Sequence, residues 1–186
     1  MRVDLGAKPY IFPMPVLIIG TYDENGRANA MNAAWGMACD MNKVAITLSA
    51  EHKTVKNILK TGDFTVSIAD TEHIAECDYL GIVSGNSEPD KLEKCGFTVT
   101  KSDKVNAPII NELPLALECE LECYDTESEI LIGVIKGVSA EQSILVDGKI
   151  DVSRLSPITY DTENHTYIAL GEAVGKAFSD GKRIKK

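Results

Sequence analysis

Residues 15–21 read Pro-Val-Leu-Ile-Ile-Gly-Thr, a short apolar run rich in β-branched side chains. Asp-Glu-Asn-Gly follows at 23–26, and an Asn-Gly pair between two extended runs is a strong signal for a tight β-turn. The chain then returns through 28–35 (Ala-Asn-Ala-Met-Asn-Ala-Ala-Trp) and runs out again at 43–49 (Lys-Val-Ala-Ile-Thr-Leu-Ser). This pattern predicts an antiparallel meander of strands.

A further strand is predicted at residues 115–123, where apolar and acidic side chains alternate. One face of the strand would carry Leu115, Leu117, Cys119, Leu121 and Cys123. The opposite face would carry Glu118, Glu120 and Glu122, as expected of a strand that is exposed on one side. Residues 130–138 and 166–170 also read as strands, and Asp147-Gly148 predicts a second hairpin turn.

Helical segments are few and short. The clearest covers residues 54–61, with Thr54 predicted as its N-cap and Gly62 at its C′ position. Shorter segments at 71–77 and 89–96 begin and end with similar signals. Many strands with small connecting helices predict a mainly β protein built on a closed or partly closed barrel.

The composition is that of an ordinary globular protein. The 186 residues predict one domain that spans residues 1–186. There are 19 basic and 28 acidic residues, giving a formal charge of −9, which argues against a nucleic acid or an anionic membrane surface as partner. No segment approaches the ~20 apolar residues of a membrane span. The five cysteines contain no Cys-x-x-Cys pair, which favours reduced thiols in a cytoplasmic protein.

Several classes of site lack their motifs. The three histidines (His52, His73 and His165) are scattered, so no metal site is predicted. No Gly-x-Ser-x-Gly elbow is present, and no Gly-x-Gly-x-x-Gly follows a strand. Residues 171–176 (Gly-Glu-Ala-Val-Gly-Lys) lack the spacing and the final Ser or Thr of a phosphate loop.

The most informative region joins the strand at 43–49 to the helix at 54–61. The start of a helix presents free backbone N–H groups and a partial positive charge, which suit a phosphate. Lys53 and Lys56 add cationic donors, and Thr54 adds a hydroxyl. The alternative interpretation is that Thr54 only caps the helix and that the lysines are solvated.

A second candidate segment is 29–35. Its small residues allow a close approach of the backbone, and the amides of Asn29 and Asn32 offer paired donors and acceptors. A planar heterocycle with ring nitrogens and carbonyls could lie against such a segment. The alternative is a tightly packed strand crossing in the barrel.

Together these segments resemble the flavin reductase-like family with the FMN-binding split barrel, which includes the flavoredoxins. The motifs that carry the resemblance span nearly the whole chain. They are Pro15-Val16 through Thr21, Asn25-Gly26-Arg27-Ala28-Asn29, Ala34-Trp35, Ser49-x-x-His52-x-Thr54, Asp78-x-x-Gly81-x-x-Ser84-Gly85, Asp90-Lys91, Ser156-Pro157-Ile158-Thr159-Tyr160 and Tyr167-x-x-Leu170-Gly171.

The resemblance implies a six-stranded antiparallel split β-barrel of Greek-key type, a homodimer, and one FMN per subunit near the dimer interface. It also implies which residues hold the flavin ring, the ribityl chain and the phosphate. These residues are Asn29, Ala30, Met31, Asn32, Ala33, Ala34, Trp35, Ser49, His52, Lys53 and Thr54. In the implied dimer, residues 175–178 would form a lid over the site, with Phe178 as its apolar element.

The resulting functional hypothesis is an FMN-binding oxidoreductase or electron-transfer flavoprotein of the flavoredoxin type, with NAD(P)H or a redox protein as partner. One alternative is an NAD(P)H:flavin reductase that uses FMN as an exchangeable substrate, and another is a non-catalytic flavin-binding module. Hydride or electron transfer needs alignment with the flavin rather than a side-chain nucleophile. The sequence therefore predicts no catalytic residue.

Overall fold

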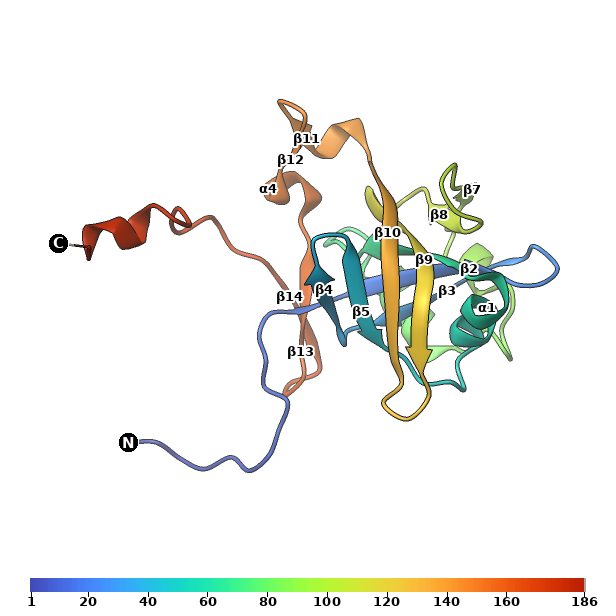
Figure 1. Ribbon diagram of the computed structural model, residues 1–186, viewed down its shortest axis with the longest axis horizontal. Coiled ribbons are helices and arrows are strands. Elements are labelled where there is room, and N and C mark those ends of the chain that lie inside the picture. Colours follow the sequence, from blue (N-terminus) through green and yellow to red (C-terminus); the bar gives the residue numbers. More distant parts are fainter. Residues whose placement is uncertain (186) are drawn as a thin grey trace.

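Seven antiparallel strands form the main sheet of the computed structural model, which describes residues 1–185 (Figure 1). In spatial order they are β3 (Ala28–Ala33), β2 (Leu17–Tyr22), β6 (Asp63–Ile68), β9 (Leu115–Asp125), β10 (Ile130–Ala140), β5 (Lys43–Thr47) and β4 (Gly36–Asp40). The predicted antiparallel split barrel is confirmed. The sheet has seven strands rather than six, and β4 is a strand that the sequence pattern did not predict.

The sheet curls because its two edge strands are neighbours in the sequence. β3 and β4 lie at opposite ends of the strand order, but only Ala34 and Trp35 separate them. A chain covers at most about 3.6 Å per residue, so the two edges must lie within about 11 Å of each other at this point. The carbonyl of Trp35 accepts a hydrogen bond from the N–H of Thr47 (2.8 Å). This bond ties the crossing to the end of β5.

Smaller elements surround the barrel. A second sheet contains β1 (Met14–Pro15), β13 (Ile158–Asp161) and β14 (Thr166–Ala169). Two hairpins pair β7 (Val99–Lys101) with β8 (Pro108–Ile110) and β11 (Leu145–Val146) with β12 (Lys149–Ile150). The helices are α1 (Lys53–Thr61), α2 (Ile74–Ile82), α3 (Lys91–Lys94), α4 (Val152–Leu155), η1 (Gln142–Ile144) and η2 (Asp180–Arg183). No helix within residues 1–185 is long and apolar enough to cross a membrane.

Both predicted hairpin turns are confirmed. Between β2 and β3, the Asp23 carboxylate accepts hydrogen bonds from the N–H groups of Asn25 and Arg27 (both 2.9 Å). Gly26 adopts a φ of 76°, a left-handed conformation that suits glycine. Between β11 and β12, Asp147 and Gly148 both have positive φ (49° and 72°), as a two-residue type I′ turn requires.

The predicted alternation of β9 holds only in part. The pairing with β10 shifts register where Cys123 opposes Ile132 but Leu121 opposes Gly133, so Glu122 is bulged out. Beyond this bulge Tyr124 packs toward the core and Cys123 is exposed, the reverse of the prediction. Glu118, predicted to be exposed, is buried and accepts a hydrogen bond from the Ser102 hydroxyl.

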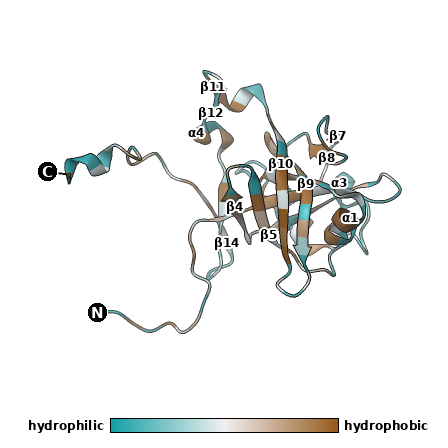
Figure 2. Cartoon of the chain, viewed as in Figure 1, coloured by the Kyte–Doolittle hydropathy of each residue, from teal (hydrophilic) through white to brown (hydrophobic). Residues whose placement is uncertain are grey.

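The hydrophobic core has two main parts. One fills the barrel around Ile19, Ile46, Phe64 and Leu131, and α1 packs Val55 and Ile58 against it. The other lies between β2, α2 and α3. Figure 2 shows hydrophobic residues concentrated in the strands of the main sheet and in α1, and hydrophilic ones in the C-terminal helical turn. Both chain ends extend away from the barrel on the side of β13 and β14 (Figure 1).

Candidate functional site

Two adjoining cavities lie where the edges of the sheet meet. The large cavity, about 420 Å³, is enclosed by the β3–β4 crossing, the end of β5, α2 and the β13–β14 hairpin. The small cavity, about 180 Å³, lies between the start of α1 and the loop that follows α2. Both are lined by Met31, His52, Gly81 and Ile82, so the cavities form one cleft with two chambers.

Much of the lining of the large cavity is apolar. Its apolar and small residues are Val16, Met31, Ala33, Ala34, Trp35, Leu48, Gly81 and Ile82. Ala33 and Ala34 leave the backbone open to a flat ligand, and Trp35 is 50% exposed. A chamber of this size with an apolar wall and a few polar groups is typical of a site for a planar organic ligand.

The lining of the large cavity also carries polar groups, from β3, α2 and the β13–β14 hairpin. The Tyr167 hydroxyl donates to the Asp78 carboxylate (2.7 Å), and the Tyr160 hydroxyl lies 2.8 Å from Nδ1 of His165. Burial, followed by the hydrogen bond to Asp78, raises the pKa of Tyr167 well above its usual range. The side-chain N–H of Asn32 donates to the backbone carbonyl of Cys77 (3.0 Å), so the side-chain oxygen of Asn32 remains for a ligand.

The start of α1 differs from the prediction. The helix begins at Lys53 with His52 as N-cap and no side-chain cap, so Thr54 is its second residue and the predicted Thr54 cap is wrong. The backbone N–H of His52 donates to the carbonyl of Ser49 (3.1 Å), and this turn starts the helix earlier. The Thr54 hydroxyl instead accepts a buried hydrogen bond from the Asn29 amide (2.8 Å). The two predicted segments, 29–35 and 49–54, are therefore in direct contact.

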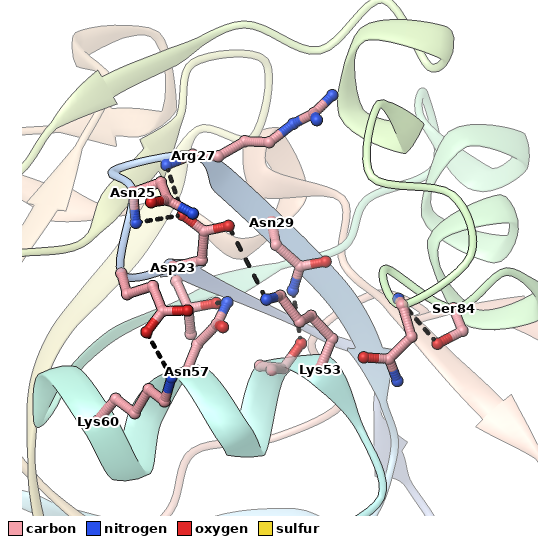
Figure 3. A network of polar contacts seen from close by, with 12 residues as sticks. Asp23, Asn25, Arg27, Asn29, Lys53, Asn57, Lys60 and Ser84 are labelled. Carbon is pink, nitrogen blue, oxygen red and sulfur yellow. Dashed lines mark hydrogen bonds and ion pairs between the residues drawn. The ribbon is translucent and has the colours of Figure 1, made fainter.

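The small cavity is basic in a protein that is strongly acidic. Its lining includes Lys53 and Lys91 and contains no aspartate or glutamate. Lys53 Nζ lies 3.8 Å from the Asp23 carboxylate, and Figure 3 shows the Lys53 side chain between Asp23 and Asn29. Hydrogen bonds from the backbone, that of Arg27 first, and then the charge of Lys53 lower the pKa of Asp23. The chamber has the electrostatic character of an anion site.

Two further observations describe the small cavity. The side-chain oxygen of Asn29 is buried and has no hydrogen-bond partner among residues 1–185. Gly85 packs directly against this amide, and a Cβ at Gly85 would overlap the Asn29 oxygen. Only glycine therefore fits at this position without a shift of the Asn29 amide.

Most of the sequence-predicted residues come together in this cleft. Those that line it are Met31, Asn32, Ala33, Ala34, Trp35, His52, Lys53 and Thr54. Asn29 lies behind Thr54, whereas Ala30 is fully buried and Ser49 contributes its backbone carbonyl to the turn. Phe178 is 98% exposed and lies in the C-terminal segment, away from the barrel (Figure 1).

Other residues of the cleft were missed as site residues. They are Val16, Thr47, Leu48, Asp78, Leu80, Gly81, Ile82, Val83, Ser84, Gly85, Lys91, Tyr160, His165 and Tyr167. Several of them are positions of the motifs that carry the family resemblance, which was the available signal. Within residues 1–185, no group of three or more His, Cys, Asp or Glu side chains could hold a metal ion.

The sequence and the fold match known proteins. The sequence model of one family, described as Flavin reductase like domain, matches residues 10–164. The flavoredoxin of Desulfovibrio vulgaris (Miyazaki F) has a solved structure that is 35% identical, with a TM-score of 0.93 and coverage of 97% of this chain and 100% of that one. An FMN-binding domain of a flavin reductases-like enzyme from Shewanella baltica OS155 is 20% identical (TM-score 0.79, coverage 87% and 88%), a likeness of fold alone.

A curated relative of unassigned function also matches the chain. An uncharacterized protein from Aeropyrum pernix is 27% identical over 122 residues, which are 64% of this chain and 46% of that protein. The match therefore spans under half the length of this relative.

Proposed function

The chain belongs to the family described as Flavin reductase like domain, and on this premise we propose that it is an FMN-binding oxidoreductase or electron-transfer flavoprotein of the flavoredoxin type. Its family and structural neighbours support a flavin-binding redox function. Bound flavin supplies hydride- and electron-transfer chemistry, and the residues of this chain bind it, orient it and limit the access of water.

The observation that carries the proposal is the division of the cleft into two chambers. The apolar chamber beside residues 31–35 suits the flavin ring, and the basic chamber beside Lys53 and Thr54 suits its phosphate. The first N–H groups of α1 lie at the same place and favour an anion. One small basic chamber next to one helix start fits a monophosphate better than a pyrophosphate, so we propose FMN rather than FAD.

The exposed apolar surface supports a homodimer. Trp35, directly before β4, is 50% exposed, Met37 on β4 is 66% exposed, and Met41 directly after it is 97% exposed. Such a patch beside an unpaired sheet edge is typical of a surface that a partner covers. In this dimer the C-terminal segment with Phe178 would reach the cleft of the partner rather than its own.

Purification and flavin binding test the proposal. We expect the protein to carry flavin, or to take it up at micromolar concentration, and mass analysis of the released ligand to give FMN. Release of FAD would contradict the cofactor assignment, and no uptake would contradict the site. Bleaching of the bound flavin by NAD(P)H under anaerobic conditions would separate an enzyme from a passive binder. Loss of the flavin during gel filtration would favour the exchangeable-substrate alternative.

A further inference from the structure

The β13–β14 hairpin brings two tyrosines and a histidine into the lining of the large cavity. Tyr160 on β13 pairs directly with Tyr167 on β14, and the centroids of their rings lie 6.0 Å apart. His165 lies in the turn between the two strands and has a φ of 53°, a left-handed conformation. All three residues line the cavity, so their polar atoms lie beside a molecule that occupies it.

The two tyrosine hydroxyls differ in how firmly they hold their hydrogens. The Tyr167 hydroxyl donates to the Asp78 carboxylate (2.7 Å), and burial followed by this hydrogen bond raises the pKa of Tyr167 well above its usual range. The Tyr160 oxygen lies 2.8 Å from Nδ1 of His165. When Nδ1 carries a hydrogen, it donates to the Tyr160 oxygen, and the hydroxyl hydrogen of Tyr160 is free for a ligand. Tyr160 can therefore donate to a bound molecule, whereas the hydrogen of Tyr167 is already committed to Asp78.

His165 can replace a proton that Tyr160 gives away. A tyrosinate at position 160 would take the Nδ1 hydrogen across the same 2.8 Å contact. His165 is exposed to solvent, so its imidazole regains a proton from water. A tyrosine that is hydrogen-bonded to a histidine in contact with water is suited to general acid catalysis.

The lining of the large cavity indicates what kind of molecule would receive this proton. Among residues 1–185, the lining contains no lysine or arginine, and Asp78 is its one carboxylate. An anionic ligand therefore gains little there, in contrast to the basic small cavity. Trp35, Tyr160 and Tyr167 provide aromatic surface, which suits a flat, neutral molecule.

We infer that the large cavity also binds a neutral conjugated aldehyde or ketone, and that Tyr160, supported by His165, is the acid that protonates its oxygen during reduction. This inference rests on the proposed FMN site, with NAD(P)H as the reductant that supplies reduced flavin. The N–H bond of the reduced flavin breaks, and its hydride forms a C–H bond at the β-carbon of the acceptor. The double bond shifts and the electron pair moves to the carbonyl oxygen, which takes the Tyr160 proton. The flavin loses two electrons, and the resulting enol converts in water to the saturated carbonyl compound.

The test follows the reoxidation of reduced flavin in single turnovers. FMN-loaded protein is reduced with dithionite and mixed, without oxygen, with one of two acceptors. Cinnamaldehyde is a flat, neutral conjugated aldehyde, whereas ferricyanide accepts one electron and no proton. The proteins are wild type, Tyr160→Phe, His165→Asn and the control Tyr79→Phe. Tyr79 is on α2 but lines a different cavity.

The ratio of the cinnamaldehyde rate to the ferricyanide rate isolates the proton transfer. We expect Tyr160→Phe to lower this ratio roughly a hundredfold or more, the range of general acid catalysis. His165→Asn keeps a residue that tolerates a left-handed φ and should lower the ratio less, because water can still reach Tyr160. Tyr79→Phe should have the ratio of wild type.

Binding of cinnamaldehyde to the oxidised, FMN-loaded protein is a second readout that does not depend on turnover. Oxidised flavin cannot reduce the aldehyde, so a change in the visible flavin spectrum gives the dissociation constant. Tyr160→Phe should weaken binding only about two- to tenfold, as expected for the loss of one neutral hydrogen bond. A loss of binding as large as the loss of rate would overturn the role of Tyr160 as an acid.

The remaining outcomes separate this inference from the proposed function. A wild type that binds no FMN would contradict the proposed function itself. A wild type that binds FMN but does not reduce cinnamaldehyde would overturn the substrate class and leave the FMN site intact. Turnover with an unchanged ratio in Tyr160→Phe would overturn the role of Tyr160, and an unchanged ratio in His165→Asn would overturn that of His165.

Discussion

We expect replacement of Thr54 by Val to destabilise the flavin-free protein, because it removes the bond between β3 and α1. The Thr54 hydroxyl accepts from the Asn29 amide at 2.8 Å, and the two residues are 1% and 6% exposed. Valine keeps the shape of threonine but cannot accept a hydrogen bond. The oxygen of the same amide already has no partner within residues 1–185, so the whole amide would be left unpaired.

The magnitude follows from this burial. Leaving a buried donor without a partner costs ~1–3 kcal/mol, whereas replacing both partners by apolar groups of similar shape is close to neutral. The double variant Asn29→Leu/Thr54→Val should therefore be more stable than the sum of the two single changes predicts. We expect a coupling free energy of roughly 1–2 kcal/mol, in the range measured for residues in direct contact.

Urea unfolding of the four flavin-free proteins measures this coupling. The midpoint should fall in Thr54→Val without a change in the slope of free energy against urea, which reports the surface exposed on unfolding. A Thr54→Val protein within about 0.3 kcal/mol of wild type would refute the reasoning. Strictly additive changes in the double variant would refute it as well, since they would mean that Asn29 and Thr54 do not interact.

Three further predictions concern the cleft and its surroundings. Gly85→Ala should weaken FMN at least tenfold and destabilise the protein by ~1–3 kcal/mol, because its Cβ would overlap the Asn29 oxygen and lie 3.3 Å from Lys53. Gly171→Ala, whose Cβ would meet nothing within 4 Å, is the matched control for both titration and urea unfolding. Burial lowers the pKa of Lys91 from 10.5 to about 8 in the folded protein, so the charged form of this lysine destabilises the flavin-free fold below pH 8. Between pH 8 and 10.5 the unfolded chain binds this proton and the folded protein does not, so the free energy of unfolding should rise with pH across this range. Lys91→Met should lack this rise, and parallel profiles of the two proteins would contradict the assignment. Truncation after Gly175 should speed FMN release in stopped-flow measurements if the C-terminal segment closes the cleft of a partner, and an unchanged rate would exclude that role.

The strands that could be predicted from the sequence are those with a local sequence pattern typical of strands or tight turns. Residues 17–22 and 43–47 are rich in β-branched side chains, and the Asn25-Gly26 turn fixes the first hairpin. β4 has no such signal, because Gly-Met-Ala-Cys-Asp is neither alternating nor β-branched, and its pairing with β5 makes it a strand. The packing of Tyr124 toward the core could not be predicted from the sequence either, since the bulge that causes it depends on the register of β9 with β10.

The residues of the candidate site likewise fall into those that could be predicted from the sequence and those that could not. Residues 29–35 and 49–54 were predicted because each is a continuous segment whose composition is compatible with a ligand and because the family resemblance implies a flavin there. Asp78 and Lys91 belong to motifs of the family resemblance, but nothing in those motifs shows that the two residues lie in the cleft, and only the folded chain brings them to α1 and β3. No local pattern predicts that a lysine will be buried without a carboxylate, because that property depends on the packing of α3 against the loop after α2.

The cleft at the meeting edges of the sheet also sets an order of events during synthesis. Its walls come from Val16 near one end of the chain and from Tyr167 near the other, 151 residues later. At ~5–20 residues per second, a ribosome needs roughly 8–30 s to make the stretch between them. During that time the first hairpin exists without the β13–β14 wall. A growing chain therefore has no complete binding cleft, and the nascent protein must finish its last strand pair before it can capture a flavin.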